Sequence, residues 1–210
     1  MKINSINGLK TTLGVLLTAG TLSVSAQVPK VKSLTPHLTK DVFVKIDSLV
    51  TPKGTTDTLV LKGAPSPFVF VEGIKKTASI VVDLSKNVLY KFNDTGEAEA
   101  AYRVASGKKS TPTHTGLRIV SHVETYPYKN APASSKRRNN PNDYGPKIIV
   151  LDKLDPKTGE TSYFGEFIHG NRNPSSIGKY ASKGCVRMDN QVIRILSTQV
   201  KRGALVWIKK

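Results

Sequence analysis

The sequence predicts a mostly β domain, folded as a sandwich or a barrel-like sheet, with one principal helix near its carboxyl end. Short runs rich in valine, isoleucine and aromatic residues alternate with turns of glycine, proline and asparagine along most of the chain, which is the pattern of a β domain. Only one long segment, after Met188, carries apolar residues at helical spacing. The 210 residues suffice for one domain with a sizeable core.

The first segment, residues 1–26, has the pattern of a secretory signal peptide. Lys2 and Lys10 flank its amino end, a short apolar stretch runs from Leu13 to Leu22, and Val24-Ser25-Ala26 fits a small-residue cleavage site. The apolar stretch is well short of the ~18 to 20 residues that a membrane-spanning helix needs. We therefore expect export, with no stable membrane insertion after the signal is cleaved.

Residues 27–75 are predicted to be a linker with accessory strands. The segment is punctuated by proline and glycine, as in "TPKGTTDT" and "GAPSPF". Short β-like runs occur at residues 42–46, 59–61 and 68–71. These strands are expected to pack on the domain that follows.

Residues 76–210 are predicted to form the main domain. Its opening run, "SIVVDLSKNVLYKF", reads as a hairpin whose turn is Ser85-Lys86-Asn87. Further candidate strands lie at residues 98–105, 117–123, 148–152, 163–168 and 205–208. Residues 126–146, rich in proline, asparagine and serine, show no periodicity, so they are either a lid or binding loop, or a solvated loop.

The principal helix is expected to begin after Asp189, a residue type that caps helix N-termini. Its apolar residues, among them Val192, Ile193 and Leu196, fall on one face. Gly203, after two basic residues, is the predicted C-cap. A short helical turn is predicted at residues 174–179.

The chain is strongly basic, with 32 Lys and Arg against 15 Asp and Glu, which favours an anionic partner. The sequence contains no zinc-finger spacing, no aromatic RNA-binding signature and no basic heptad helix. We therefore expect no nucleic-acid partner, and an anionic cell wall or lipid surface instead.

The single cysteine, Cys185, follows His169 by sixteen positions. An exported chain with one cysteine cannot form an internal disulfide, so the thiol is either a buried, inert side chain or a nucleophile. Lys183, Arg187 and the following helix could each favour a thiolate. On these residues alone the two interpretations stand about even.

Glycine and serine around the thiol suit the second interpretation. Gly184 would permit a tight turn that presents the Cys185 sulfur, with nearby amides free to stabilise an oxyanion. Gly170 would let the backbone pass close to the imidazole of His169. Ser182 could supply one positioning hydrogen bond.

The segment "HGNRNPSSIGKYASKGCVRM" resembles the active-site signature of the YkuD-type L,D-transpeptidases. The matching positions are His169, Gly170, Ser182, Gly184, Cys185, Val186, Arg187 and Met188. A looser resemblance extends from about Ser79 to Ile208 and includes "ASGKKSTPTHTG" and "GALVWI". Two departures are visible, an insertion at residues 113–115 and Lys183 at a position that is often histidine or asparagine.

The resemblance implies an L,D-transpeptidase-like β-sandwich whose helix packs after the catalytic cysteine. It also implies that Cys185 attacks the carbonyl of the third residue of a peptidoglycan tetrapeptide stem and that His169 accepts the thiol proton. The Gly170 carbonyl would orient the imidazole, amides around Gly184 would hold the oxyanion, and Arg187 would brace the loop or contact stem carboxylates. A periplasmic or wall location follows.

The expected partners are peptidoglycan stem peptides, and no metal or cofactor is expected because the four histidines lack ligand spacing. An amine from a second stem would give a 3-3 cross-link, whereas water would give L,D-carboxypeptidase action. Sortase-like and papain-like enzymes are disfavoured, the former because their histidine lies much farther upstream and the latter because their cysteine precedes it. A non-catalytic peptidoglycan-binding module remains an alternative from another class.

Overall fold

The computed structural model describes residues 63–210, and the predicted signal peptide, most of the linker and the strands expected at residues 42–46 and 59–61 lie outside them. The strands are β1 (Phe68–Val71), β2 (Ile74–Thr77), β3 (Ile80–Asp83), β4 (Val88–Phe92), β5 (Ala98–Arg103), β6 (Ser106–Gly107), β7 (Gly116–Thr125), β8 (Lys147–Leu154), β9 (Thr161–His169), β10 (Tyr180–Ser182), β11 (Val186–Arg187) and β12 (Leu205–Lys209). The helices are α1 (Lys136–Asn139), α2 (Asn190–Gln199) and the 3₁₀ turns η1 (Pro141–Tyr144) and η2 (Pro174–Ser176).

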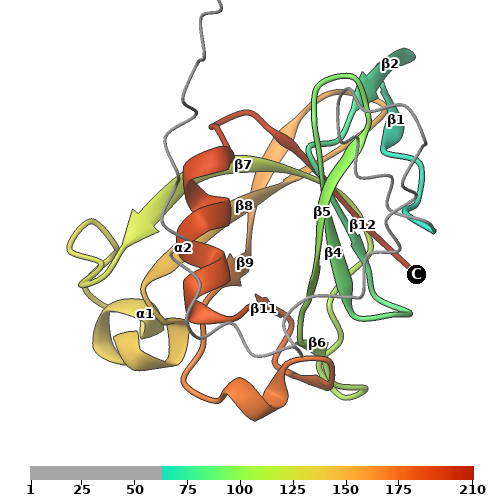
Figure 1. The fold of residues 1–210 in the computed structure, drawn as a ribbon. Helices are drawn as coiled ribbons and strands as arrows, with labels where there is room; N and C mark the ends of the chain where they lie inside the picture. The colour runs from blue at the N-terminus through green and yellow to red at the C-terminus, as the bar shows by residue number, and fades with distance from the viewer. Residues whose placement is uncertain (1–62) are drawn as a thin grey trace, which may run out of the picture. The chain divides into compact units, whose positions relative to one another are not determined.

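Eight strands form one curled sheet in the order β11-β9-β8-β7-β12-β3-β4-β5 (Figure 1). Most neighbours are antiparallel, but β12 pairs with β3, and β11 with β9, in parallel. The two outer edges meet at Ala105 and Arg187, which exchange backbone hydrogen bonds of 2.8 Å in both directions. The mostly β class is therefore confirmed, and the two packed layers of the predicted sandwich are two halves of one sheet.

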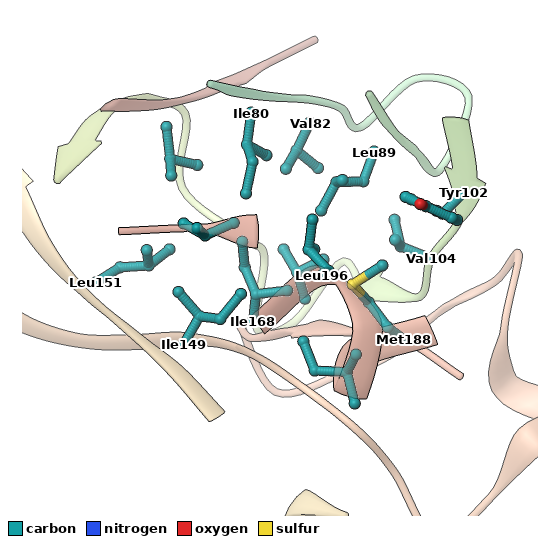
Figure 2. Close-up of a cluster of buried hydrophobic side chains, with 14 of the residues drawn as sticks. Ile80, Val82, Leu89, Tyr102, Val104, Ile149, Leu151, Ile168, Met188 and Leu196 are labelled. Carbon is teal, nitrogen blue, oxygen red and sulfur yellow. The ribbon is translucent and has the colours of Figure 1, made fainter. Parts of the chain in front are cut away.

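The main core lies between the curled sheet and α2. Figure 2 shows Ile80 and Leu89 from the hairpin facing Ile149 and Ile168 from the other half of the sheet, with Leu196 of α2 beside them. Each of these side chains is fully buried. The predicted amphipathic helix is confirmed, because its apolar face completes this core.

Asp189 caps α2 as predicted. Its Oδ1 accepts hydrogen bonds from the amides of Gln191, at 2.7 Å, and Val192, at 3.3 Å. The predicted C-cap is wrong, since the helix ends at Gln199 and Val200 is already extended. Gly203 instead takes a positive φ of 85° in the turn that leads into β12.

The aperiodic segment 126–146 packs on the sheet. Tyr128 and Ala131 are buried against Ile148 and Val150, on the face of β8 opposite to Ile149 and the core. The segment, called the cap below, also contains α1 and η1, which periodicity could not reveal because each is a single short turn. No helix within residues 63–210 is long and apolar enough to cross a membrane.

Candidate active site

His169 is the last residue of β9, and strand pairing fixes its position relative to the cysteine. Its register partner is Ile148 on β8 and Arg187 on the parallel strand β11. The amide of Met188 donates a 2.8 Å hydrogen bond to the His169 carbonyl. Because β11 starts directly after Cys185, the parallel pairing brings the two ends of the sequence motif together.

The imidazole of His169 is held in one tautomer. Its Nδ1 donates to the Gly170 carbonyl oxygen over 2.5 Å, the contact that the resemblance implied, so that Nε2 is left as the proton acceptor. The side chain is buried, and this burial lowers the pKa of His169 to about 4. The charge of Arg187 lowers the pKa further, whereas the hydrogen bond to the Gly170 backbone raises it. At neutral pH His169 is a neutral base.

Cys185 is also mostly shielded from solvent and is the only cysteine of the chain. It packs with the apolar cluster formed by the cap and the outer faces of β8 and β9, which includes Tyr144 and Phe167. Burial raises the pKa of the Cys185 thiol to about 11, while the backbone of Phe167 and the charge of Arg187 act in the opposite direction. The resting pair is therefore a neutral thiol and a neutral imidazole.

The backbone around the thiol is fixed by Ser182, which is fully buried. Its Oγ accepts a 3.1 Å hydrogen bond from the Gly184 amide and donates one of 2.5 Å to the Cys185 carbonyl. Gly184 has φ +117°, which side chains rarely allow. Because the Gly184 amide is engaged by Ser182, the Cys185 amide is left as the better placed of the two predicted oxyanion donors.

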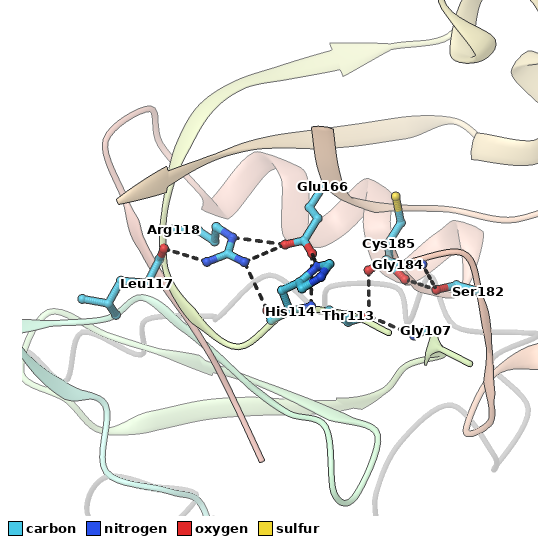
Figure 3. A network of polar contacts seen from close by, with 9 residues as sticks. All are labelled: Gly107, Thr113, His114, Leu117, Arg118, Glu166, Ser182, Gly184 and Cys185. Atoms are coloured by element: carbon cyan, nitrogen blue, oxygen red, sulfur yellow. Dashed lines mark hydrogen bonds and ion pairs between the residues drawn. The ribbon is translucent and has the colours of Figure 1, made fainter. Parts of the chain in front are cut away.

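A segment far away in the sequence braces this loop (Figure 3). The hydroxyl of Thr113 donates to the Gly184 carbonyl over 2.7 Å and accepts from the Gly107 amide over 2.9 Å. The hydroxyl of Thr111 reaches the Ser182 carbonyl over 3.2 Å. A Cβ on Gly107 would lie 2.3 Å from the Thr111 carbonyl oxygen, so only glycine allows the segment to fold this tightly.

A buried ion pair also holds the segment that contains Thr113. The guanidinium of Arg118 donates from Nε and Nη2 to one Glu166 oxygen, at 3.1 and 2.9 Å. The other Glu166 oxygen accepts from the amide of His114, the residue after Thr113, at 3.1 Å. Glu166 also directly precedes Phe167, whose backbone contacts the thiol. The ion pair therefore positions both the segment that braces the cysteine loop and a strand residue next to Cys185.

Cys185 and His169 open into one cavity of about 160 Å³. Arg187 and Lys183 line it from the cysteine side, and Lys136, Asn140, Asp143 and Tyr144 line it from the cap. The rings of Tyr144 and His169 lie 4.9 Å apart, centroid to centroid. With three cations and one carboxylate, the cavity suits an anionic ligand.

The cap is tied to the sheet by a second buried pair. Arg137 of α1 donates from Nε and Nη2 to the two oxygens of Glu124 on β7, at 2.7 and 2.9 Å. Its guanidinium also lies 5.2 Å from the centre of the Phe167 ring. The cap wall of the cavity thus rests on a bidentate ion pair.

Of the six site residues predicted from sequence, His169, Cys185 and Arg187 line the cavity. Gly170, Ser182 and Gly184 lie behind it and shape the backbone. Sequence reasoning missed the supporting residues Thr113, Arg118, Glu166, Glu124 and Arg137. The quoted segment "ASGKKSTPTHTG" contained Thr113, but nothing in the sequence indicated its distant partners.

The remaining histidines of the described region lie outside the cavity. His114 and His122 have side chains that are 60% and 50% exposed, and His122 lies on strand β7. Within residues 63–210 no group of three or more His, Cys, Asp or Glu side chains could hold a metal ion.

Comparison with known proteins identifies the family of the chain. Residues 77–208 match the YkuD family, described as the L,D-transpeptidase catalytic domain. The YkuD protein of Bacillus subtilis (strain 168) is 29% identical over 153 residues, which cover 73% of this chain and 75% of that protein.

Solved structures with a similar fold include two L,D-transpeptidases. The Enterococcus faecium enzyme is 21% identical, with a TM-score of 0.45 and a match over 63% of this chain. The chain spans about half of that enzyme, 49% of its length. The Mycobacterium smegmatis enzyme is 18% identical, with a TM-score of 0.42 and coverage of 70% of this chain and 69% of its own.

Proposed function

Because the chain belongs to the YkuD family of L,D-transpeptidase catalytic domains, we propose that it is an exported cysteine L,D-transpeptidase that acts on peptidoglycan tetrapeptide stems. The observation that carries the proposal is the fixed imidazole: Nδ1 of His169 is bound to the Gly170 carbonyl, and Cys185 lines the same cavity. A base with one committed nitrogen beside a nucleophile is the arrangement that acyl transfer requires.

The first half-reaction forms a thioester. As the Cys185 sulfur bonds to the carbonyl carbon of the third stem residue, its proton passes to Nε2 of His169. The carbonyl oxygen becomes an oxyanion beside the amide of Cys185. The carbon–nitrogen bond to the terminal D-alanine then breaks, and His169 returns the proton to the departing amine.

The second half-reaction releases the enzyme. The side-chain amine of a second stem attacks the thioester carbon and gives its proton to His169. The carbon–sulfur bond breaks, the proton passes to the sulfur, and a 3-3 cross-link results. If water attacks instead, the product is a shortened stem with a free carboxylate.

The neutral resting pair supports this sequence of steps. With the thiol pKa near 11 and the imidazole pKa near 4, the proton stays on sulfur until a substrate carbonyl is in place. The charge of Arg187 lowers the pKa of both groups, so it favours the thiolate but disfavours the imidazolium, and the two effects oppose each other when the proton passes from Cys185 to His169. An exposed thiolate, by contrast, would be vulnerable to oxidation after export.

Product analysis tests the proposal. The full chain is incubated with a disaccharide-tetrapeptide, and the products are separated and weighed by mass spectrometry. We expect free D-alanine and a cross-linked dimer, both absent with Cys185→Ala. A shortened monomer without dimer would indicate carboxypeptidase action, and unchanged substrate would indicate a binding module.

Export is part of the proposal and has its own test. In cells that produce the full chain, we expect the envelope fraction to contain a protein that begins at Gln27. A chain that keeps Met1 and stays in the cytoplasmic fraction would contradict it.

A further inference from the structure

A cleft that takes no part in the proposed reaction lies beside strand β10. Its volume is about 430 Å³, within the roughly 300 to 1,000 Å³ of common ligand sites. Its lining includes Tyr180, Pro112 and three lysines, Lys108, Lys109 and Lys210, and it shares no lining residue with the reaction cavity. This space is called the lysine cleft below.

One wall of the lysine cleft is bonded to the loop that carries the nucleophile. Thr113 lines the cleft, and its hydroxyl donates to the Gly184 carbonyl over 2.7 Å. The amide of Lys108 donates to the Ser182 carbonyl over 3.1 Å. Figure 3 shows the sulfur of Cys185 pointing away from Thr113. A ligand in the lysine cleft would therefore contact the brace of the cysteine loop without entering the reaction cavity.

The side-chain charges that line the lysine cleft are all positive. Its three lysines are exposed, and none of their ammonium groups forms an ion pair with a carboxylate of residues 63–210. No Asp or Glu is among the lining residues, whereas Asp143 lines the reaction cavity. Asp83, which precedes the lining residue Leu84, is 5% exposed and already accepts a hydrogen bond from Ser85. The cleft therefore attracts an anion.

The type of these cations favours phosphate over carboxylate. Arginine presents a planar fork that matches a carboxylate through two parallel hydrogen bonds, whereas the lysine ammonium is a compact point charge that is a common phosphate ligand. Lysine lines the lysine cleft and arginine does not, while Arg187 lines the reaction cavity. The two spaces are therefore suited to different anions.

A fixed aromatic ring indicates the rest of the ligand. Tyr180 is 55% exposed, and its hydroxyl donates to the carbonyls of Leu84, at 2.8 Å, and Ser85, at 3.3 Å. Pro112, also exposed, adds a second apolar surface. Apolar surface beside a few charged groups suits a ligand that has one apolar face and one charged group. A sugar phosphate has both, the C–H face of its ring and its phosphate.

We propose that the lysine cleft binds a sugar phosphate within a phosphate-bearing polysaccharide of the cell envelope, with Lys108 and Lys109 on the phosphate and Tyr180 against the sugar ring. Binding there would hold the enzyme on the envelope while the reaction cavity stays open to stem peptides. The envelope as the source of the ligand rests on the proposed function, because it requires an exported protein. The chemistry of the cleft does not.

Titration with glucose 1-phosphate tests the lysine cleft. The full chain should bind it saturably, and Lys108→Gln with Lys109→Gln should raise the Kd about tenfold or more, the loss expected when hydrogen bonds to a charged group are removed. The matched control is Lys201→Gln with Arg202→Gln, which removes two exposed charges before β12, at the opposite end of that strand from Lys210. This control should leave the Kd unchanged. Absence of saturable binding, or an equal Kd in the two double variants, would overturn the proposal.

Amide resonances of the unaltered chain locate the ligand even if a variant misfolds. On addition of glucose 1-phosphate, the resonances of Lys109 and Thr113 should shift, and that of Asp143 in the cap should not. Glucose alone should cause no shift, because it lacks the charge. Shifts confined to the reaction cavity would contradict the assignment.

Inorganic phosphate tests the contribution of the ring. It should bind more weakly than glucose 1-phosphate, because it has no face to pack against Tyr180. Tyr180→Ala should weaken the binding of glucose 1-phosphate but not that of inorganic phosphate. Equal binding of the two probes to the unaltered chain would show a site for phosphate alone and would overturn the assignment of a sugar.

Two further probes identify the class of partner. Vesicles of phosphatidylglycerol and phosphatidylcholine present phosphate without a sugar ring, and a disaccharide-tripeptide presents sugars and carboxylates without phosphate. Neither should need Lys108 and Lys109 in order to bind. If loss of these lysines weakened the binding of either probe more than that of glucose 1-phosphate, the cleft would be a lipid or peptide surface and the proposal would fail.

Thioester formation separates this proposal from the proposed function. The Lys108→Gln, Lys109→Gln protein should form the thioester at Cys185 from a disaccharide-tetrapeptide at an unchanged rate, because neither lysine lines the reaction cavity. A rate that falls with the loss of the lysines would place them in the reaction site and overturn a separate cleft. Absence of any thioester in the unaltered protein would overturn the proposed function, and the Kd for glucose 1-phosphate would still decide the lysine cleft.

Discussion

Two buried arginine–glutamate pairs support the site, and they hold different kinds of structure. Arg118 and Glu166 lie on β7 and β9 within one sheet, and they fasten the segment that braces the cysteine loop. Arg137 and Glu124 join the cap to β7. The first pair is part of the sheet's own framework, whereas the second attaches a separate wall to it. This difference predicts which pair controls stability and which controls the cavity.

The largest expected effect follows loss of the framework pair. Arg118 is 1% exposed and also donates to the carbonyls of His114 and Leu117. Arg118→Met should lower the free energy of unfolding by roughly 3 to 5 kcal/mol, because Glu166 stays buried with only His114 as a partner and the Leu117 and His114 carbonyls lose their donor as well. Urea denaturation measures this change. A loss below about 1 kcal/mol, the value of an exposed pair, would show that the pair is not part of the framework.

A smaller effect on stability is expected from the cap pair. Arg137→Met removes two hydrogen bonds to Glu124, whereas Arg118 also holds two backbone carbonyls. Glu124 keeps His122, whose Nε2 lies 3.1 Å from it, as Glu166 keeps His114. We expect a loss of about 2 kcal/mol, together with faster proteolysis within residues 126–146. If Arg137→Met cost as much stability as Arg118→Met and left proteolysis unchanged, the distinction between the two pairs would fail.

The brace itself can be altered by one atom. Thr113→Val keeps the shape of the side chain but removes the hydroxyl that joins Gly107 to Gly184. We expect about 1 to 3 kcal/mol less stability and a slower acylation of Cys185 at unchanged donor KM. The control is Thr158→Val, whose hydroxyl contacts only an exposed turn amide at 3.3 Å. Equal acylation rates in the two variants would contradict the role of the brace.

The smallest expected effect is the dependence of stability and kcat/KM on pH. Since burial lowers the pKa of His169 to about 4, the neutral imidazole and its share of stability are fully present above pH 6.5 and are lost as the pH falls through about 4. The acid limb of kcat/KM should therefore lie near pH 4. An acid limb of kcat/KM near pH 6.5 would instead mean that the imidazole of His169 is solvated.

Much of this arrangement was predictable from local patterns. The hairpin at 79–92, the capped helix after Asp189 and the His169–Cys185 motif are all encoded over short distances, where residue spacing reports directly on geometry. The two buried arginine–glutamate pairs could not be predicted in this way. Glu166 and Arg118 lie 48 positions apart, on strands separated by β8, so the sequence shows two charged residues in strands but not that they meet.

The cap illustrates the other limit of sequence reasoning. Its composition was compatible with a lid, a binding loop or a solvated loop, because a segment rich in proline and asparagine shows no periodic apolar pattern. Its place is decided by Tyr128 and Ala131 packing on the second face of β8. That face is visible in the sequence only as an uninterrupted apolar run, residues 148–151, which the structure buries on both sides.

The most direct test of the central claim is the mass of the intact protein shortly after mixing with a disaccharide-tetrapeptide donor. We expect a transient increase equal to the mass of the donor minus D-alanine, located at Cys185. This species should be absent in Cys185→Ala and should form more slowly in His169→Gln. Turnover of the donor without an adduct at Cys185, or an undiminished adduct in His169→Gln, would contradict it.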